Sequence, residues 1–279
     1  MSFLVLLLVV LILRFTPWRQ GFPFDALGRW ARVVQEKSRL SPVWQTLILL
    51  ALPLLLAGIV LWVLRGHVYG LLTLIAHVAL VLVAVGRNDP LGSMALAFEE
   101  AWQRGDQEAA YHVARRDLQL DSAGPNDLLR GVDASLARAT FRDYVTPVFW
   151  YLLLGPLGPL GYRLLDRFEQ QQEHFDQEHP ALPAVMRISH ALEWLPSRLF
   201  ALSLALVGDF ERTLGLLRGW LLRWEVSADR VVSGCVAAAL GDEQQAAGAT
   251  ASILHPVRTL LARSLMVWAA CIAFFSLFG

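Results

Sequence analysis

The chain is poor in charge, in lysine and in cysteine. Only 17% of its 279 residues are charged, and 24 basic and 24 acidic residues give a formal net charge of zero. This balance argues against a nucleic-acid-binding protein, which carries a basic surface. Lys37 is the single lysine, and Cys235 and Cys271 are the two cysteines. Because the cysteines lack CxxC spacing, they predict buried small side chains rather than a disulfide or a thiolate metal site.

The sequence also lacks the short motifs of common enzyme classes. It has no P-loop, no dinucleotide-binding glycine motif, no GxSxG nucleophile elbow and no HExxH helix. Acidic residues are scarce within its apolar stretches, so a proton-coupled transporter is a weak alternative.

Apolar residues, by contrast, make up 56% of the chain. That share predicts an integral membrane protein. Apolar runs cover 3–13, 43–64, 66–86 and 260–278. The first run has no basic segment before it and no A-x-A-like site after it, so we interpret it as a retained helix rather than a signal peptide. Because membrane segments must satisfy their own backbone hydrogen bonds, we expect an all-α, polytopic helical fold.

Basic residues predict the orientation of these helices. The loop 14–41 holds six basic residues against two acidic ones, whereas the turn between the second and third apolar runs offers Arg65 alone. Cytoplasmic loops are enriched in Arg and Lys, so we expect loop 14–41 and the later polar regions in the cytoplasm. Within the loop, residues 24–40 have the amphipathic pattern of a helix that lies in the interface of the lipid bilayer.

The hydropathy pattern divides the chain into four regions. Residues 1–86 form an N-terminal three-helix membrane region that includes the interfacial helix. Residues 87–143 form a cytoplasmic helical insertion. Residues 144–224 form a broken-helix pocket region, and residues 225–279 hold a small-residue helix and a C-terminal membrane anchor. In the insertion, Gly105 and Asp106 are expected to end one helix and cap the next.

Two apolar segments are interrupted by kinking residues. The first reads PVFWYLLLGPLGPLGYRLLDRFE (147–169) and the second ALEWLPSRLFALSLALVGDFE (191–211). A plain membrane anchor needs neither the Gly and Pro residues of the first nor Arg198 close after Pro196 in the second. Irregular backbone at membrane depth is tolerated where it lines protein or water. We therefore expect two Gly/Pro-broken membrane segments that form a site.

Arginines lie at the edges of both segments. Placing an arginine in hydrocarbon costs roughly 2.5 to 3.5 kcal/mol, so such residues face a cavity, a carboxylate or an anionic ligand, or else extend to the headgroups. Arg163, Arg187 and Arg198, with Glu193 and His190 nearby on the second segment, are candidates for a polar pocket.

Asp166 and Glu169 share a helix face with Arg163 one turn earlier. Such a pair of carboxylates binds a hard cation such as magnesium, or holds an arginine in an intrahelical ion pair. The residues alone leave both the cation site and the ion pair open. If a metal or a catalytic acid is present, Asp166 and Glu169 are the candidates.

The stretches SLARATFRDYVTPVFWYLLLGPLGPLGYRLLDRFE and RISHALEWLPSRLFALSLALVGDF resemble the AmpE family of Gram-negative inner-membrane proteins. That family belongs with the CobD/CbiB membrane enzymes of cobalamin synthesis. The resemblance covers the whole chain in hydropathy layout, and its specific motifs lie within about residues 133–210. It implies a regulatory or sensory protein of the bacterial inner membrane, linked to the amidase AmpD, to β-lactamase induction and thereby to antibiotic resistance.

The CobD/CbiB enzymes use ATP and magnesium, with acids in motifs resembling ESLAEN, NTLD and RLDD. Here Ala134 and Arg138 stand at the two glutamates of the first motif, residues 166–169 at the second and residues 187–190 at the third. The cationic half of an anion site thus persists while much of the metal-binding half is substituted. The positions that match the shared pattern are Pro147, Phe149, Tyr162, Arg163, Arg187, Trp194, Pro196 and Arg198.

Three hypotheses from different classes follow. The first is a regulatory membrane protein whose cytoplasm-facing pocket binds an anionic ligand, such as a cell-wall metabolite or a nucleotide. The second is an ATP/Mg-dependent amide-forming or phosphate-transferring enzyme. The third is a structural partner of another membrane protein, and the small residues in 231–241 and 246–251 would suit a homo-oligomer. The expected ligand-binding residues are Tyr162, Arg163, Arg187, His190, Glu193 and Arg198.

Overall fold

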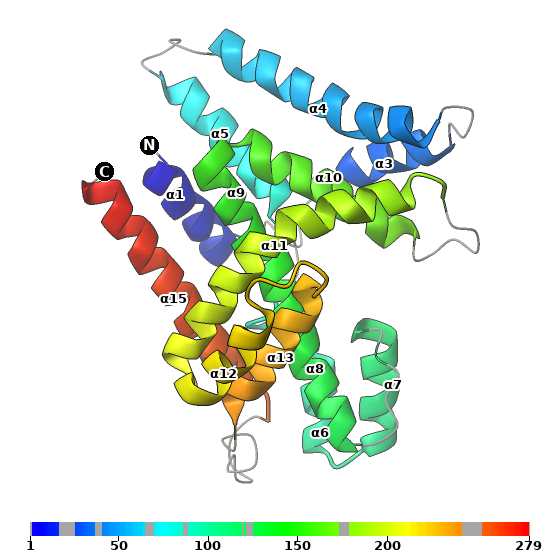
Figure 1. Ribbon diagram of the computed structural model, residues 1–279, viewed down its shortest axis with the longest axis vertical. Coiled ribbons are helices and arrows are strands. Elements are labelled where there is room, and N and C mark those ends of the chain that lie inside the picture. Colours follow the sequence, from blue (N-terminus) through cyan, green and yellow to red (C-terminus); the bar gives the residue numbers. More distant parts are fainter. Residues whose placement is uncertain are drawn as a thin grey trace. The chain divides into compact units, whose positions relative to one another are not determined.

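The structure is a computed structural model that describes residues 2–16, 26–36, 41–64, 70–85, 89–118, 120, 125–172, 179–241 and 253–278. All regular elements within these ranges are helices (Figure 1). The all-α prediction is therefore confirmed for the part of the chain that the structure describes. The helices form two compact units, residues 1–87 with 146–193 and residues 88–145 with 194–279.

The first unit is built around α10 (Leu157–Gln172), which packs against four other helices of the unit. Its residues Leu165 and Phe168 are buried with Leu49 and Val185 in one apolar cluster. The amphipathic spacing of α10 places these side chains on one face. The other helices of the unit are α1 (Ser2–Phe15), α3 (Ala26–Glu36), α4 (Pro42–Leu64), α5 (Leu71–Ala84), α9 (Thr146–Leu154) and the part of α11 (Leu182–Val207) up to Glu193.

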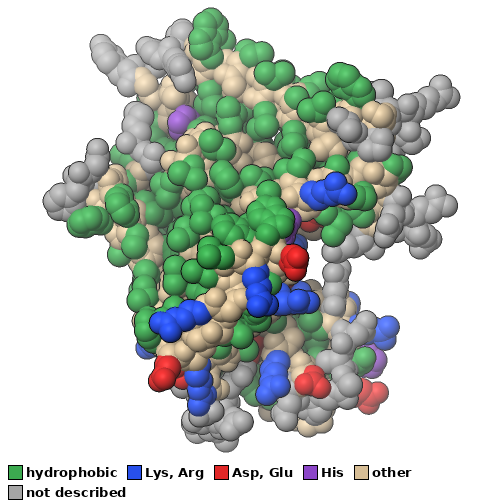
Figure 2. All heavy atoms as spheres, viewed as in Figure 1, with side chains coloured by type: hydrophobic (Ala, Val, Ile, Leu, Met, Phe, Trp, Pro, Cys, Tyr) green, Lys and Arg blue, Asp and Glu red, His purple; other side chains and the backbone are tan. Residues whose placement is uncertain are grey.

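The second unit has a larger apolar core, which includes Leu136, Phe141, Phe200 and Val232. Helix α8 (Pro125–Thr140) packs against α13 (Ala228–Leu240) through this core. Figure 2 shows basic side chains gathered over the region of α12 (Phe210–Trp220). The remaining elements of the unit are η2 (Ser93–Ala95), α6 (Leu96–Gln103), α7 (Gln107–Leu118), the π-helical turn η3 (Phe141–Val145), the rest of α11, and α15 (His255–Phe278).

The helix pair predicted in the insertion is present. Helix α6 ends at Gln103 and α7 begins at Gln107. Gly105 has a φ of 75°, which a glycine adopts without steric cost, and the Asp106 carboxylate accepts a hydrogen bond from the amide of Ala109 at 2.9 Å. Glycine thus ends one helix and aspartate caps the next, as predicted.

Two helices are long and apolar enough to cross a membrane, Trp44–Leu64 in α4 and His255–Ser276 in α15. Only 11% and 17% of their most apolar stretches are buried within the protein, so both expose mostly apolar surface that hydrocarbon would cover. Helices α1 and α5 are apolar but shorter. Of the predicted interfacial helix 24–40, the structure describes α3, and the turn at Arg65 lies outside the described residues.

The two interrupted segments differ from each other. The chain turns between α9 and α10 at Gly155, whose φ is 65°. The predicted break at Pro196 is wrong, because α11 runs through it from Leu182 to Val207. Proline removes one backbone N–H and thereby frees the carbonyl four residues earlier, that of Leu192. The indole Nε1 of Trp150 donates to this carbonyl at 3.1 Å, which satisfies the acceptor that the proline leaves over.

The division of the chain into four consecutive regions, made from hydropathy, remains a prediction. Each compact unit, by contrast, combines two segments that are distant in sequence. Helix α11 contributes to both, since residues up to Glu193 belong to the first unit and those from Trp194 onward to the second.

Candidate functional site

Arg163 and Asp166 form a buried ion pair on α10. Their side chains are 2% and 3% exposed, and Nη1 of Arg163 lies 2.6 Å from Oδ2 of Asp166. The Arg163 Nε donates to the backbone carbonyl of Ala84 at 2.6 Å, and Gln170 donates to the same Asp166 oxygen at 3.0 Å. The intrahelical ion pair, one of the two alternatives left open by the sequence, is therefore formed and ties α10 to the end of α5.

Tyr162 and Glu193 join α10 to α11 within the first unit. The phenol donates to Oε1 of Glu193 at 2.7 Å, and both side chains are buried. A hydrogen bond to a carboxylate in a buried site is stronger than one between neutral groups. The pair connects the two helices that carry all six predicted ligand-binding residues.

Arg198 is 3% exposed in the second unit and pairs with no carboxylate among the described residues. Its Nη2 donates to the carbonyls of Arg223 and Val226 at 3.0 Å each, and its Nη1 to Ser197 Oγ at 3.0 Å and the Trp194 carbonyl at 3.2 Å. The guanidinium lies 4.8 Å from the centroid of the Trp194 ring. Its Nε and the indole N–H of Trp194 have no acceptor in the described part of the chain.

The other predicted site residues belong to the first unit. Arg187 is exposed on α11, whereas His190 on α11 and Glu169 on α10 are half-buried. Within this unit the structure brings Tyr162 to Glu193 and Arg163 to Asp166. That all the predicted residues share one pocket with Arg198 remains a prediction.

A metal site has no ready-made ligand cluster in the residues described. No group of three or more His, Cys, Asp or Glu side chains lies close enough together there to hold an ion. The Asp166 carboxylate, the first candidate ligand, already accepts two hydrogen bonds on Oδ2.

Two further polar features of the second unit were not predicted. Arg258, at the start of α15, pairs with Glu99 at 2.8 Å and donates to the carbonyl of Gly92 at 2.8 Å. Asp133 on α8 is 5% exposed, and its burial raises its pKa to about 7. The sequence signalled Arg258 only as a basic flank of an apolar run, and nothing marked Asp133, whose burial depends on how α8 packs.

These observations define a class: an all-helical membrane protein whose described part holds long apolar helices and buried, hydrogen-bonded arginines. Residues 1–259 match the family described as "Regulatory signalling modulator protein AmpE", and the chain belongs to that family. The resemblance indicated by the sequence is thereby confirmed.

Two curated relatives agree with this assignment. The chain is 27% identical to Protein AmpE of Shigella flexneri over 163 residues. This aligned stretch covers 54% of this chain and 56% of the relative. It is 28% identical to Cobalamin biosynthesis protein CobD of Stutzerimonas stutzeri over 173 residues. This aligned stretch covers 60% of this chain and 56% of the relative. The matched part thus spans little more than half the length of each relative. No solved structure matches the chain.

Proposed function

We propose that this chain is a regulatory protein of the bacterial inner membrane that modulates β-lactamase induction in response to cell-wall stress. The family match over residues 1–259 supports the regulatory class. We further propose that it spans the membrane several times with its main polar regions in the cytoplasm. The two long apolar helices and the basic loop 14–41 support that topology.

We propose that the signal is an anionic ligand and that Arg198 supplies the main charge for its recognition. The observation that carries this proposal is a buried guanidinium with hydrogen bonds to carbonyls and a hydroxyl but no carboxylate partner among the described residues. A buried charge without a counter-ion is costly, and an anion would offset that cost. The unpartnered N–H groups of Arg198 and Trp194 offer donors to it.

Arg163 fits this role less well, because Asp166 already neutralises it. Arg187 is exposed, so it suits a role in first attracting an anion rather than holding it in a desolvated site. We propose that all six ligand-binding residues predicted from the sequence contribute to this site, and Arg198 is the best supported of them.

Thermal unfolding of the purified protein in detergent, with muropeptides, nucleotides and phosphorylated metabolites added singly, tests the ligand. We expect one anionic class to raise the unfolding midpoint of the wild type and of Arg218→Gln, since Arg218 is exposed on α12 of the same unit. Arg198→Gln should lose the shift. A ligand that stabilises Arg198→Gln as strongly as the wild type overturns the proposed role of Arg198.

The regulatory role has a separate test in cells. Deleting the gene from a host with an inducible β-lactamase should change the enzyme activity reached after exposure to a β-lactam. Expression of the wild-type chain should restore it. Unchanged induction after deletion contradicts the regulatory proposal, whatever the outcome of the ligand assay.

The match to CobD supports a second candidate, an ATP/Mg-dependent enzyme in which Asp166 and Glu169 hold the metal. Purified protein should then consume nucleotide in the presence of magnesium and a carboxylate or phosphate acceptor, and Glu169→Gln should abolish the turnover. Equal nucleotide consumption by wild type and Glu169→Gln would contradict the proposed role of Glu169 in holding the metal.

A further inference from the structure

Helix α4 carries its own markers of depth in a membrane. Trp44 and Trp62 are 60% and 69% exposed, and their separation of 18 positions along the helix corresponds to about 27 Å at 1.5 Å per residue. A hydrocarbon layer is about 30 Å thick, and tryptophan prefers its two interfaces. The exposed large side chains between the two tryptophans are all apolar: Leu47, Leu52, Leu55, Leu56, Ile59 and Val60. The segment from Trp44 to Trp62 therefore matches the width of the hydrocarbon layer.

The turn between α9 and α10 lies beside this segment. A Cβ on Gly58 would stand 4.0 Å from the Leu157 side chain, and one on Gly161 would stand 3.7 Å from Leu54. Further along, Leu165 of α10 shares an apolar cluster with Leu49. Helix α10 thus runs alongside α4 in the opposite direction. Its first residue, Leu157, faces Gly58, which lies about 6 Å from Trp62 along the axis of α4.

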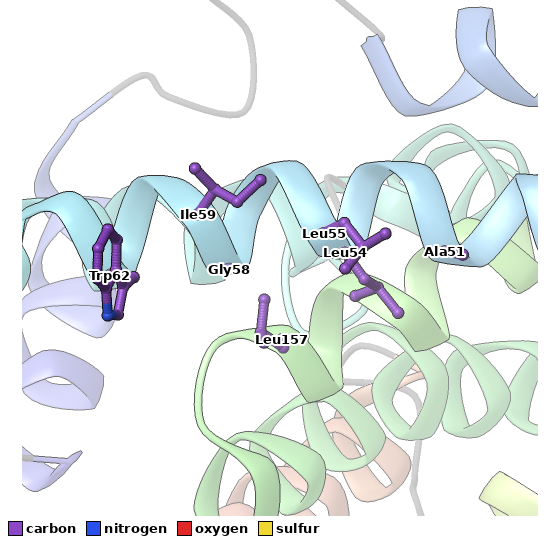
Figure 3. Close-up of a pocket in the computed structure, with 7 residues that line it drawn as sticks. All are labelled: Ala51, Leu54, Leu55, Gly58, Ile59, Trp62 and Leu157. Atoms are coloured by element: carbon purple, nitrogen blue, oxygen red, sulfur yellow. The ribbon is translucent and has the colours of Figure 1, made fainter.

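A groove runs along α4 where the start of α10 meets it. Its volume is about 540 Å³, within the range of ligand sites, and it is lined by carbon side chains apart from the Trp62 indole. Figure 3 shows Leu157 facing Gly58, with Trp62 at one end and Ala51 at the other. A neighbouring groove of about 310 Å³ shares Ala51 and Leu55 and reaches Trp44.

We propose that this groove binds one acyl chain of a membrane phospholipid. The lining offers no charge and, apart from the Trp62 indole N–H at one end, no hydrogen-bonding group for a polar ligand. Its position between the two tryptophans places it in hydrocarbon. From Ala51 to Trp62 it extends about 16 Å along the helix, a shape that suits an extended chain.

A helix from a second copy fits the groove less well. Close helix packing in membranes requires small residues along the contact. Here Gly58 is flanked by Leu55, Ile59 and Trp62, three bulky side chains that are 57% to 69% exposed. They hold another backbone away and leave only a narrow space above the glycine. A flexible hydrocarbon chain can enter such a space.

The acyl chain would also support the part of the fold that carries the candidate site. Leu157 lines the groove at the first turn of α10, and the same helix carries Tyr162, Arg163 and Asp166. Occupancy of the groove would thus help to fix the start of α10 against α4. This inference does not depend on the proposed regulatory function, because it concerns a separate ligand and a separate surface.

Gly58→Leu tests the proposal, since its Cβ would stand at an ordinary contact distance of 4.0 Å from Leu157 and the rest of the added side chain would occupy the groove. Gly215→Leu is the matched control, because Gly215 is also helical and also has open space around it. Native mass spectrometry of protein extracted from phospholipid nanodiscs counts the phospholipids retained per chain. We expect the wild type and Gly215→Leu to retain one phospholipid more than Gly58→Leu.

Ala51→Phe fills the opposite end of the groove and guards against a folding defect peculiar to Gly58→Leu. It should lose the same phospholipid while its circular dichroism spectrum stays that of the wild type. Equal lipid counts in all folded variants overturn the proposal. So does loss of a dimer rather than of a lipid in Gly58→Leu, because the groove would then bind a second copy of the chain.

Discussion

The indole of Trp150 donates a hydrogen bond to the carbonyl of Leu192 at 3.1 Å, four residues before Pro196. In an uninterrupted helix that carbonyl would accept from the amide of residue 196, which proline lacks. The indole on α9 therefore replaces the bond that the proline removes from α11. The sequence alone predicts a break at Pro196, because the compensating donor lies 42 residues away.

Trp150→Phe should therefore destabilise the protein by about 1 to 2 kcal/mol, because it leaves a partly buried carbonyl without its donor. The matched change Trp44→Phe on exposed α4 should cost much less. Unfolding midpoints in denaturant, measured in a single detergent, compare the two.

The proline supplies the decisive control for this prediction. In a Pro196→Ala background the Leu192 carbonyl regains its helical donor, so Trp150→Phe should cost about 1 kcal/mol less than in the wild type. Equal costs in the two backgrounds would show that Trp150 acts by packing alone.

The ion pair between Arg163 and Asp166 leads to a second prediction. Asp166→Asn leaves the Arg163 charge buried without its counter-ion and should cost about 3 to 5 kcal/mol. Replacing both residues, as Arg163→Met with Asp166→Leu, should recover most of that loss, because it removes both charges and keeps the volume filled. Thermal unfolding of the two variants checks the order. A double variant less stable than Asp166→Asn contradicts this account of the pair.

The sequence predicted the helical class, the family and the capped turn at Asp106, since each depends on local pattern or on motif. It could not predict which of the buried arginines would have a carboxylate partner in its own compact unit. Arg163 and Arg198 both lie at the edge of an apolar stretch, yet one meets Asp166 on its own helix and the other meets carbonyls 25 and 28 residues away. Contacts of the second kind depend on tertiary packing, which carries no local signal.

Asp133 predicts a pH dependence of stability. Burial raises its pKa from 3.8 to about 7, so the folded state binds a proton more tightly than the unfolded state. The stabilising effect of that proton is complete below pH 4 and is lost as the pH rises to 7, by up to about 4 kcal/mol.

The free energy of unfolding should therefore fall between pH 4 and pH 7, and Asp133→Asn should flatten this decline. Asp127→Asn, an exposed change on the same helix, serves as the control. An identical pH profile for the wild type and Asp133→Asn would mean that another group controls the dependence.

Two glycines give opposite predictions for the same substitution. A Cβ on Gly208 would lie 2.7 Å from both the Cβ and the carbonyl oxygen of Ala239, atoms that cannot move aside without shifting α13. Gly208→Ala should therefore destabilise the second unit by about 1 to 3 kcal/mol. Around Gly215, in the middle of α12, no atom lies within 4 Å of the added carbon. Gly215→Ala should stabilise the protein by up to about 1 kcal/mol, because alanine favours the helix. The clash exists only at Gly208, which directly follows α11. Unfolding midpoints that move in the same direction for both variants would therefore contradict the close approach of Gly208 to Ala239.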